Sequence, residues 1–257
     1  MRNFYHWLHL WLSVPVGLFF SIICLTGALM VFEKEITGVV LEVAPQYVET
    51  SEITGTPKIP FFRKVRYLHR YMLDKPAESG AMTTGKMIVG VTTLTSLVIL
   101  VSGFLLWLPR SRRGLLRRLS IRTNRGWRCF WRDLHVSLGF YSAVFLLLMA
   151  LTGLTWSFGW YHDLTYSLLD KRVLTEKVET HAEMRAVQRH KSERRPGATD
   201  SGAAKNTARE TRMMIRNLHI GSIGGFWTKI IWFVSALIGA SLPLTGYYLW
   251  YKRLRRS

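Results

Sequence analysis

The sequence predicts an all-α integral membrane protein, with four transmembrane helices that form two tandem two-helix repeats and two extracytoplasmic loops. Three observations predict this fold: the apolar residues gather in four long blocks, the arginines cluster on one side of them, and the two halves of the chain resemble each other. Hydrophobic residues make up 49% of the 257 residues, and each block holds a stretch almost free of charge. At about 20 residues, such a stretch is long enough for a helix to cross a hydrocarbon core of roughly 30 Å.

The four spans and the segments between them divide the chain into two repeats. We expect spans at about 4–32, 87–108, 130–158 and 227–251. The first repeat, 1–110, holds two spans and the outer loop 33–86. A basic loop, 109–132, leads into the second repeat, 130–257, which holds the other two spans and the outer loop 159–226.

The formal net charge of +19 is concentrated on one side of the predicted spans. Residues 109–132 carry nine arginines and no acid, and the C-terminal KRLRRS at 252–257 follows the fourth span. Both clusters lie on one side, which the positive-inside rule identifies as the cytoplasm. We therefore expect a bacterial inner membrane protein with both termini cytoplasmic and its outer loops in the periplasm. Because anionic lipid headgroups account for the arginines, membrane lipids are expected partners and nucleic acid is not.

The two halves of the chain align without a gap along their spans. Placing LTG at 25–27 over LTG at 151–153 puts His9 on His135. The second and fourth spans align in the same way, and a Leu-His pair precedes each of them, at 68–69 and 218–219. The aligned pairs there are Lys86 with Lys229, Gly103 with Gly246 and Trp107 with Trp250. Because each unit has two spans, the units share one orientation and an axis along the membrane normal relates them.

This repeat predicts two pairs of histidines, one at each side of the membrane. His9 and His135 lie at the cytoplasmic ends of equivalent spans, where they could face each other, and His69 and His219 form a similar pair at the outer side. A single histidine near the start of a span more often bonds a backbone carbonyl or faces the interface. Two equivalent pairs favour instead a cofactor held between two imidazoles, one from each repeat.

Imidazole is a ligand for heme iron, zinc and copper, so the ligand type alone does not choose among them. Within the spans the one carboxylate is Asp133, and no cysteine stands near either pair, so the ligands of a tetrahedral zinc shell are not gathered there. We expect heme b, with two axial histidines at each of two levels, which would form an electron path across the membrane. The weaker ligand candidates are His6 and His162, which ends the predicted third span, and the candidate partners of the heme propionates are Arg132 and Arg70.

Five segments resemble, in order, the four-span core of the PepSY-associated transmembrane family. They are FYHWLHLWLSVPVGLFFSIICLTGALMVFEKEI, YLHRYML, GFLLWLPR, RDLHVSLGFYSAVFLLLMALTGLTW and LHIGSIGGFWTKIIWFVSALIGASLPLTGYYLWYKR. That family includes inner-membrane ferric-siderophore reductases that bind b-type heme. The resemblance implies that the histidines of these motifs, His9, His69, His135 and His219, ligate heme, and that electrons pass from the cytoplasm to a ferric chelate outside.

The outer loops depart from the larger members of that family, which carry folded periplasmic PepSY domains. Residues 33–86 are few and show no clear pattern of strands and helices of that kind, and residues 181–212 are poor in apolar side chains and are expected to be flexible. A separate substrate-binding domain is therefore not expected, and recognition of the siderophore is left unassigned.

The leading functional hypothesis is a ferric-siderophore or ferric-chelate reductase. No GxGxxG follows a predicted strand, since GSIGG at 221–225 lacks that spacing and context, so the electron donor is a separate cytoplasmic reductase, a reduced flavin or membrane quinol. Two alternatives stay open: an electron-carrying heme subunit for a separate periplasmic reductase, and a heme-free membrane scaffold or regulator. The sequence chooses neither the donor nor the oligomeric state.

Overall fold

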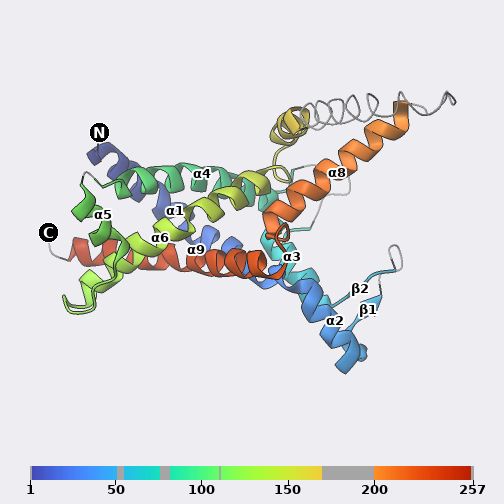
Figure 1. Cartoon of the computed structure of the whole chain (residues 1–257), viewed down its shortest axis with the longest axis horizontal. Helices are drawn as coiled ribbons and strands as arrows, with labels where there is room; N and C mark the ends of the chain where they lie inside the picture. The colour runs from blue at the N-terminus through green and yellow to red at the C-terminus, as the bar shows by residue number, and fades with distance from the viewer. Residues whose placement is uncertain (1, 51–54, 76–81, 110, 170–199, 256–257) are drawn as a thin grey trace, which may run out of the picture.

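The structure is a computed structural model of the chain and describes residues 2–50, 55–75, 82–109, 111–169 and 200–255. Within these residues four helices are long and apolar enough to cross a membrane, which confirms the predicted all-α membrane fold. They are α1 (Arg2–Val31), α4 (Thr84–Trp107), α6 (Trp127–Leu154) and α9 (Gly225–Leu254). The four helices run along the long axis of the molecule (Figure 1).

The spans form a bundle in which equivalent helices of the two repeats lie diagonally opposite each other. Helix α1 packs against α9 and α4, and α6 packs against the same two helices. Both chain ends lie at one end of this bundle, beside the short helix α5 (Arg112–Leu119) (Figure 1). We call this the basic end, because the arginine-rich residues 109–132 lie there, and the opposite end the far end.

At the far end each repeat adds a helix that rests on its own first span. Helix α3 (Pro60–Tyr71) packs against α1 and α4, and α8 (Asp200–Ile220) packs against α6. The other described residues of the first outer loop form α2 (Glu33–Val43), the 3-10 turn η1 (Pro45–Tyr47) and an antiparallel hairpin of β1 (Glu49–Thr50) and β2 (Pro57–Lys58).

The third span begins and ends a few residues earlier than predicted. It was expected to reach residue 158, but α6 ends at Leu154 and the chain turns before a second helical stretch begins at residue 159. Short-range bonds close this turn, from Trp156 N–H to the Gly153 carbonyl at 3.1 Å and from Ser157 N–H to the Leu154 carbonyl at 3.0 Å. His162 therefore does not lie on the helix that carries His135.

The prediction of a flexible segment at 181–212 is wrong for residues 200–212, which belong to α8. Residues 200–212 hold three Ala and two Arg, which are good helix formers. Thr211 and Ile215, one turn apart, are buried where α8 meets the bundle, so a narrow contact face is enough to hold the helix. Residues 181–199 lie outside the described residues.

Small residues let the spans approach closely, as is usual when helices associate in a membrane. A Cβ atom at Gly17 of α1 would lie 2.6 Å from the hydroxyl oxygen of Tyr247 on α9. That hydroxyl donates a hydrogen bond of 2.8 Å to the carbonyl of Val14. At Gly239 of α9 a Cβ would lie 2.7 Å from Leu146 of α6. These contacts fix the separation between helices that carry the histidines described next.

Candidate functional site

The structure brings His9 and His135 together at the basic end. His9 is on α1, His135 is on α6, and their ring centroids lie 6.5 Å apart with the ring planes at 84°. Because α1 and α6 are the diagonal helices, the two rings meet inside the bundle rather than on its surface. We call these residues the basic-end pair.

The structure also brings His69 and His219 together at the far end, and we call them the far-end pair. Their ring centroids lie 6.3 Å apart, with the ring planes at 62°. Burial lowers the pKa of His69 to about 3 and that of His219 to about 4, and the charge of Arg70 acts in the same direction. Both imidazoles are therefore neutral at neutral pH, which is the form that binds a metal ion.

The two separations match a pair of imidazoles on opposite sides of one metal ion. With about 2 Å from metal to nitrogen and about 1 Å from nitrogen to ring centre, the two ring centres would be about 6 Å apart. The observed values of 6.5 Å and 6.3 Å are close to this distance. Two neutral imidazoles leave the other positions around the metal to a ligand that the chain does not supply, as the four nitrogens of a porphyrin would do.

Each of the four rings is held in the same way by a neighbouring helix. Nδ1 of His9 lies 3.0 Å from the carbonyl oxygen of Ile99 and 3.3 Å from Oγ of Ser102 on α4. Cε1 of His9 lies against the next residue, Gly103, where a Cβ atom would be 3.0 Å away. A carbonyl, a hydroxyl and a glycine on one turn of α4 thus hold one edge of the ring.

The far-end rings repeat this arrangement on the other two spans. Nδ1 of His69 lies 2.9 Å from the Ile23 carbonyl and 3.0 Å from Oγ1 of Thr26 on α1, with Cε1 against Gly27. Nδ1 of His219 lies 3.0 Å from the Met149 carbonyl and 2.9 Å from Oγ1 of Thr152 on α6, with Cε1 against Gly153.

His135 completes the set on α9. Its Nδ1 lies 2.7 Å from Oγ1 of Thr245, and its Cε1 faces Gly246, where a Cβ would be 3.7 Å away. Each histidine is therefore held by a helix of its own repeat, whereas each pair joins the two repeats. We call the four dipeptides seats: Thr26–Gly27, Ser102–Gly103, Thr152–Gly153 and Thr245–Gly246.

The seats fix which ring nitrogen carries the proton. A carbonyl oxygen can only accept, so Nδ1 of His9, His69 and His219 must be the N–H donor. In His135 the same follows because Thr245 gives its own hydroxyl proton to the Leu242 carbonyl, at 2.8 Å, and can only accept from the ring. Nε2 of each ring is left with a free lone pair, and no hydrogen bond reaches it within the described residues.

The sequence spacing explains why each diagonal helix has its histidine and its seat glycine on the same face. His9 and Gly27 are 18 residues apart on α1, and His135 and Gly153 are 18 residues apart on α6. At 3.6 residues per turn this is five whole turns, so both groups face the same side of their helix, about 27 Å apart along its axis. Each diagonal helix therefore supplies a ligand at the basic end and a seat at the far end.

A cavity of about 1650 Å³ opens at the basic end, and both His9 and His135 line it. Ordinary small-molecule sites measure about 300–1,000 Å³, so this one has room for a large flat ligand. Its walls are rich in aromatic side chains, among them Trp7, Phe104, Trp107, Phe140 and Trp250.

One wall of this cavity carries a buried donor without a partner. The Trp107 ring stacks on Phe140 with centroids 3.6 Å apart, and its indole Nε1 makes no hydrogen bond within the described residues. A buried N–H left unpaired costs on the order of 1–3 kcal/mol. A carboxylate of a bound ligand would satisfy it, so the cavity fits the propionate-bearing heme that the sequence analysis expects.

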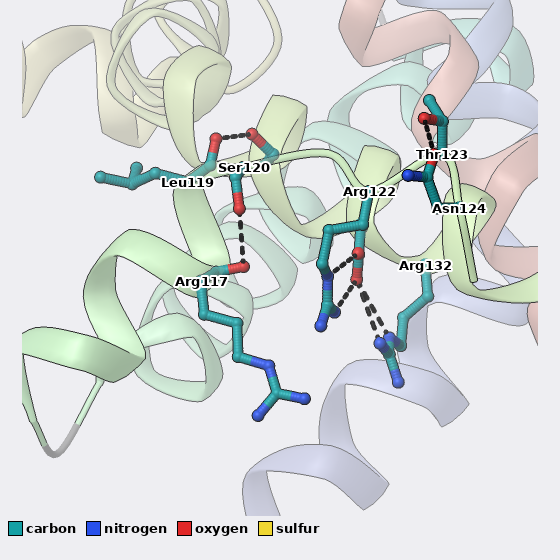
Figure 2. A network of polar contacts seen from close by, with 9 residues as sticks. Arg117, Leu119, Ser120, Arg122, Thr123, Asn124 and Arg132 are labelled. Atoms are coloured by element: carbon teal, nitrogen blue, oxygen red, sulfur yellow. Dashed lines mark hydrogen bonds and ion pairs between the residues drawn. The ribbon is translucent and has the colours of Figure 1, made fainter.

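Arginines line the cavity, and Arg132, the predicted propionate partner, shares a carboxylate with Arg122. Arg122 binds both oxygens of the Asp133 carboxylate, at 2.8 Å and 3.0 Å, and Arg132 reaches the same carboxylate at 3.1 Å (Figure 2). Three further arginines line the cavity and have no ion pair within the described residues: Arg117, Arg128 and Arg253. These are better placed than Arg132 to meet a ligand carboxylate.

The other predicted residues lie as follows. Arg70, at the far end, is exposed and lies over the ring of Tyr71 at 5.4 Å, next to His69 in the chain. His6 is exposed and lines the basic-end cavity near His9. His162 bonds Asp163 at 3.0 Å and stacks on Tyr166, within its own helical stretch. The structure thus brings His6 toward a pair and gives His162 neighbours unrelated to either pair.

The far-end helices are fixed at the turns beside their histidines. After α8 the chain turns at Gly221, whose φ of +70° suits glycine, and a Cβ there would lie 2.5 Å from Trp232. The indole of Trp232 donates to the Leu218 carbonyl at 3.0 Å. The segment GSIGG is thus a turn between two helices. In the first repeat a Cβ at Gly85 would lie 1.8 Å from the Tyr71 carbonyl oxygen, so α4 begins directly against the end of α3.

The donor set at each end is a pair of imidazoles. Within the described residues no group of three or more His, Cys, Asp and Glu side chains is placed to hold a metal ion. Tetrahedral zinc has three or four such protein ligands. Two imidazoles with a free lone pair each would fit an iron porphyrin, whose macrocycle supplies the other four ligands.

Sequence reasoning missed the seats, although a signal for them was present. The alignment of LTG with LTG, and of Gly103 with Gly246, marked the glycines as equivalent but assigned them no contact. A hydroxyl residue precedes the glycine in all four cases, and two of the glycines lie 18 residues after a histidine. Those two regularities together would have indicated a glycine on the ligand face of each span.

We expect the two seats of the basic-end pair to differ in their tolerance of a methyl group. In Gly103→Ala the new Cβ would be 3.0 Å from His9, so the ring must move by a few tenths of an ångström, whereas in Gly246→Ala the distance to His135 is an ordinary 3.7 Å. Heme content and the shape of the Soret band should change in Gly103→Ala and stay close to wild type in Gly246→Ala. Equal loss in both variants would contradict the geometry of these seats.

The fold and the paired imidazoles define a multi-pass helical membrane protein with one histidine pair at each end of a four-span bundle. The chain belongs to the family of the PepSY-associated TM region, which it matches over residues 6–49 and 42–253. The expected family is therefore confirmed. Comparison with curated proteins gives no match, and neither does comparison with solved structures.

Proposed function

We propose that the protein is a heme-b transmembrane oxidoreductase of the bacterial inner membrane, with both termini in the cytoplasm. It passes electrons from the cytoplasmic side to the periplasm, where it reduces ferric iron held by a chelator, above all a ferric siderophore, for iron uptake. The basic-end pair holds one heme and the far-end pair a second.

The observation that carries this proposal is that four imidazoles share one arrangement. Each ring donates from Nδ1 to a seat, and two pairs of rings stand 6.5 Å and 6.3 Å apart. A histidine that only satisfied a helix end would have no reason to repeat this contact at four places, nor to lie beside a histidine of the other repeat. A metal ligand needs a fixed tautomer and a partner on its second nitrogen.

The residues around each pair would hold and tune the cofactor. When bound, heme supplies one-electron chemistry, because its iron is stable in the ferric and the ferrous state. His9 and His135 would bind at the basic end, and Trp107 together with the unpaired arginines would meet the propionates. The aromatic walls would shield a bound cofactor from water.

Charge at the two ends supports the direction of electron flow. The basic end carries the arginine-rich residues 109–132 and faces the cytoplasm by the positive-inside rule. Electrons would then enter at the basic end, from a cytoplasmic reductase, a reduced flavin or membrane quinol, and leave at the far end. The two levels are about 27 Å apart along a helix, so two cofactors are needed where one would reach only part of the way.

A second candidate is an electron-carrying heme subunit for a separate periplasmic reductase. The small size of the far end favours it: in the first outer loop the described residues form only α2, η1, a two-stranded hairpin and α3. The two candidates share the heme sites and differ in where the ferric chelate binds. Purified protein that reduces a ferric chelate without a partner supports the first candidate and contradicts the second.

The experiment that tests the heme sites is an absorption spectrum of the purified protein before and after reduction with dithionite. We expect a sharp α band and a shifted Soret band on reduction, with two hemes per chain by quantitative heme assay. A folded protein without these bands would overturn both oxidoreductase candidates and leave a heme-free scaffold or regulator. One heme per chain would contradict the two-level arrangement alone.

A further inference from the structure

We propose that the hydroxyl groups of the four seats are positioning groups that hold each imidazole as the Nδ1–H tautomer and set the reduction potential of its heme. The residues are Thr26, Ser102, Thr152 and Thr245. This inference rests on the proposed function for its redox part, whereas its tautomer part concerns the protein alone.

The first argument is the direction of the hydroxyl protons. Thr152 donates to the Leu148 carbonyl at 2.6 Å, Thr26 donates to the Ile22 carbonyl at 2.7 Å, and Ser102 donates to the Ile99 carbonyl at 2.9 Å. With its only proton bound to its own helix, each hydroxyl can offer the ring nothing but a lone pair. It therefore acts on the histidine as an acceptor, in the same sense as the neighbouring carbonyl.

The second argument is that the ring is held at two adjacent atoms. Nδ1 donates to the seat and Cε1 packs against the seat glycine. The Nδ1–Cε1 edge of the ring is therefore held in place. Nε2 is bonded to Cε1, so fixing the Nδ1–Cε1 edge also fixes the direction of the Nε2 lone pair. The partner rings lie at centroid distances of 6.5 Å and 6.3 Å. The seat thus fixes the direction of the ring as well as its protonation.

The third argument concerns the electronic effect. An acceptor raises the basicity of Nε2, because it pulls the Nδ1 proton away from the ring and leaves more electron density on the imidazole. A more basic axial nitrogen stabilises ferric iron more than ferrous iron, which lowers the reduction potential of the heme. Removal of the hydroxyl should therefore raise the potential of the heme at that end and leave the other heme unchanged.

Thr93 on α4 shows what a merely structural hydroxyl looks like. It is half-buried and donates to the Val89 carbonyl at 2.7 Å, as seat hydroxyls do to their own helices, but no hydrogen bond joins it to a histidine within the described residues. Such back-bonding is common for Ser and Thr within helices. Thr93→Val is therefore a matched control, since it removes the same kind of bond with the same change of shape.

The test uses Thr152→Val and Thr245→Val, one at each end, with Thr152→Ser and Thr93→Val as controls. The first readout is the ¹⁵N chemical shifts of the imidazoles in protein prepared without heme, where the wild type should show four Nδ1–H tautomers. In Thr245→Val the His135 signal should become a mixture of tautomers. A wild type with these four histidines mainly in the Nε2–H form would overturn the proposal whether or not the protein binds heme.

The second readout is a redox titration of the heme-loaded protein. We expect Thr152→Val to raise the far-end potential only, Thr245→Val to raise the basic-end potential only, and heme affinity at the altered end to fall about 10- to 100-fold. Thr152→Ser should restore the wild-type potential, and Thr93→Val should not move either heme. Unchanged potentials in both seat variants, or equal shifts in Thr93→Val, would refute the positioning role. A wild type that binds no heme would instead refute the proposed function.

Discussion

Replacement of His135 by alanine is expected to remove the heme at the basic end and to leave the far-end heme in place, so that heme per protein falls by half. Alanine cannot supply the axial nitrogen, and the described residues hold no other imidazole with a seat at that end. His9→Ala should give the same spectrum, because the two rings share one site. The measurement is heme per chain together with the reduced spectrum of each variant.

The control for this prediction is His6→Ala. His6 lines the same cavity and lies one turn from His9, but it is exposed and has no seat. Its removal should leave both hemes bound. Loss of both hemes from a folded His135→Ala protein would contradict two separate sites, and an unchanged heme content would show that His6 or another ligand replaces it.

The sequence was sufficient for the fold because the features that determine it are local. A span needs about 20 apolar residues in a row, and such a run is visible without any long-range contact. The pairing of His9 with His135 also came from the sequence alone, because the repeat placed the two at equivalent positions and a twofold relation brings equivalent positions together. The family followed from the same motifs.

The parts that the sequence did not predict depend on contacts between distant residues. Arg132 was proposed as a propionate partner from its place one turn before His135, but its neighbour in space is the Asp133 carboxylate, which it shares with Arg122. His162 was placed at the end of the third span, and the turn after Leu154 removes it from that helix. Neither outcome is visible in hydropathy, which does not record where a side chain finds its partner.

The seats could not be predicted either, because their contacts also join residues far apart in the sequence. Thr26 and Thr152 resemble many hydroxyl residues of membrane helices that bond only their own backbone. Their contacts with His69 and His219 cross 43 and 67 residues of sequence. Only the position of α3 and α8 against the diagonal spans reveals which hydroxyls meet a ring and which, such as Thr93, do not.

Replacement of His219 by alanine is expected to stop electron transfer across the membrane while the basic-end heme can still be reduced. In the proposed path the reductant acts at the basic end, and a cofactor held by the far-end pair would bridge the remaining distance along the bundle. The assay uses inside-out membrane vesicles that contain a ferric chelate and a dye specific for ferrous iron, with dithionite added outside. The rate at which the coloured ferrous complex forms should fall to that of vesicles without the protein. His69→Ala should lower this rate to the same level.

His162→Ala is the matched control on the same side of the membrane, because its ring contacts only Asp163 and Tyr166 in the described residues. It should transfer electrons at the wild-type rate. A His219→Ala protein that keeps both the far-end heme and the wild-type rate would exclude the far-end pair from the path. If the far-end heme is lost but the rate persists, the basic-end heme must reach the acceptor by itself. Electrons would then cross without a cofactor at the far end, although the two histidine levels are about 27 Å apart. The acceptor would have to bind inside the bundle.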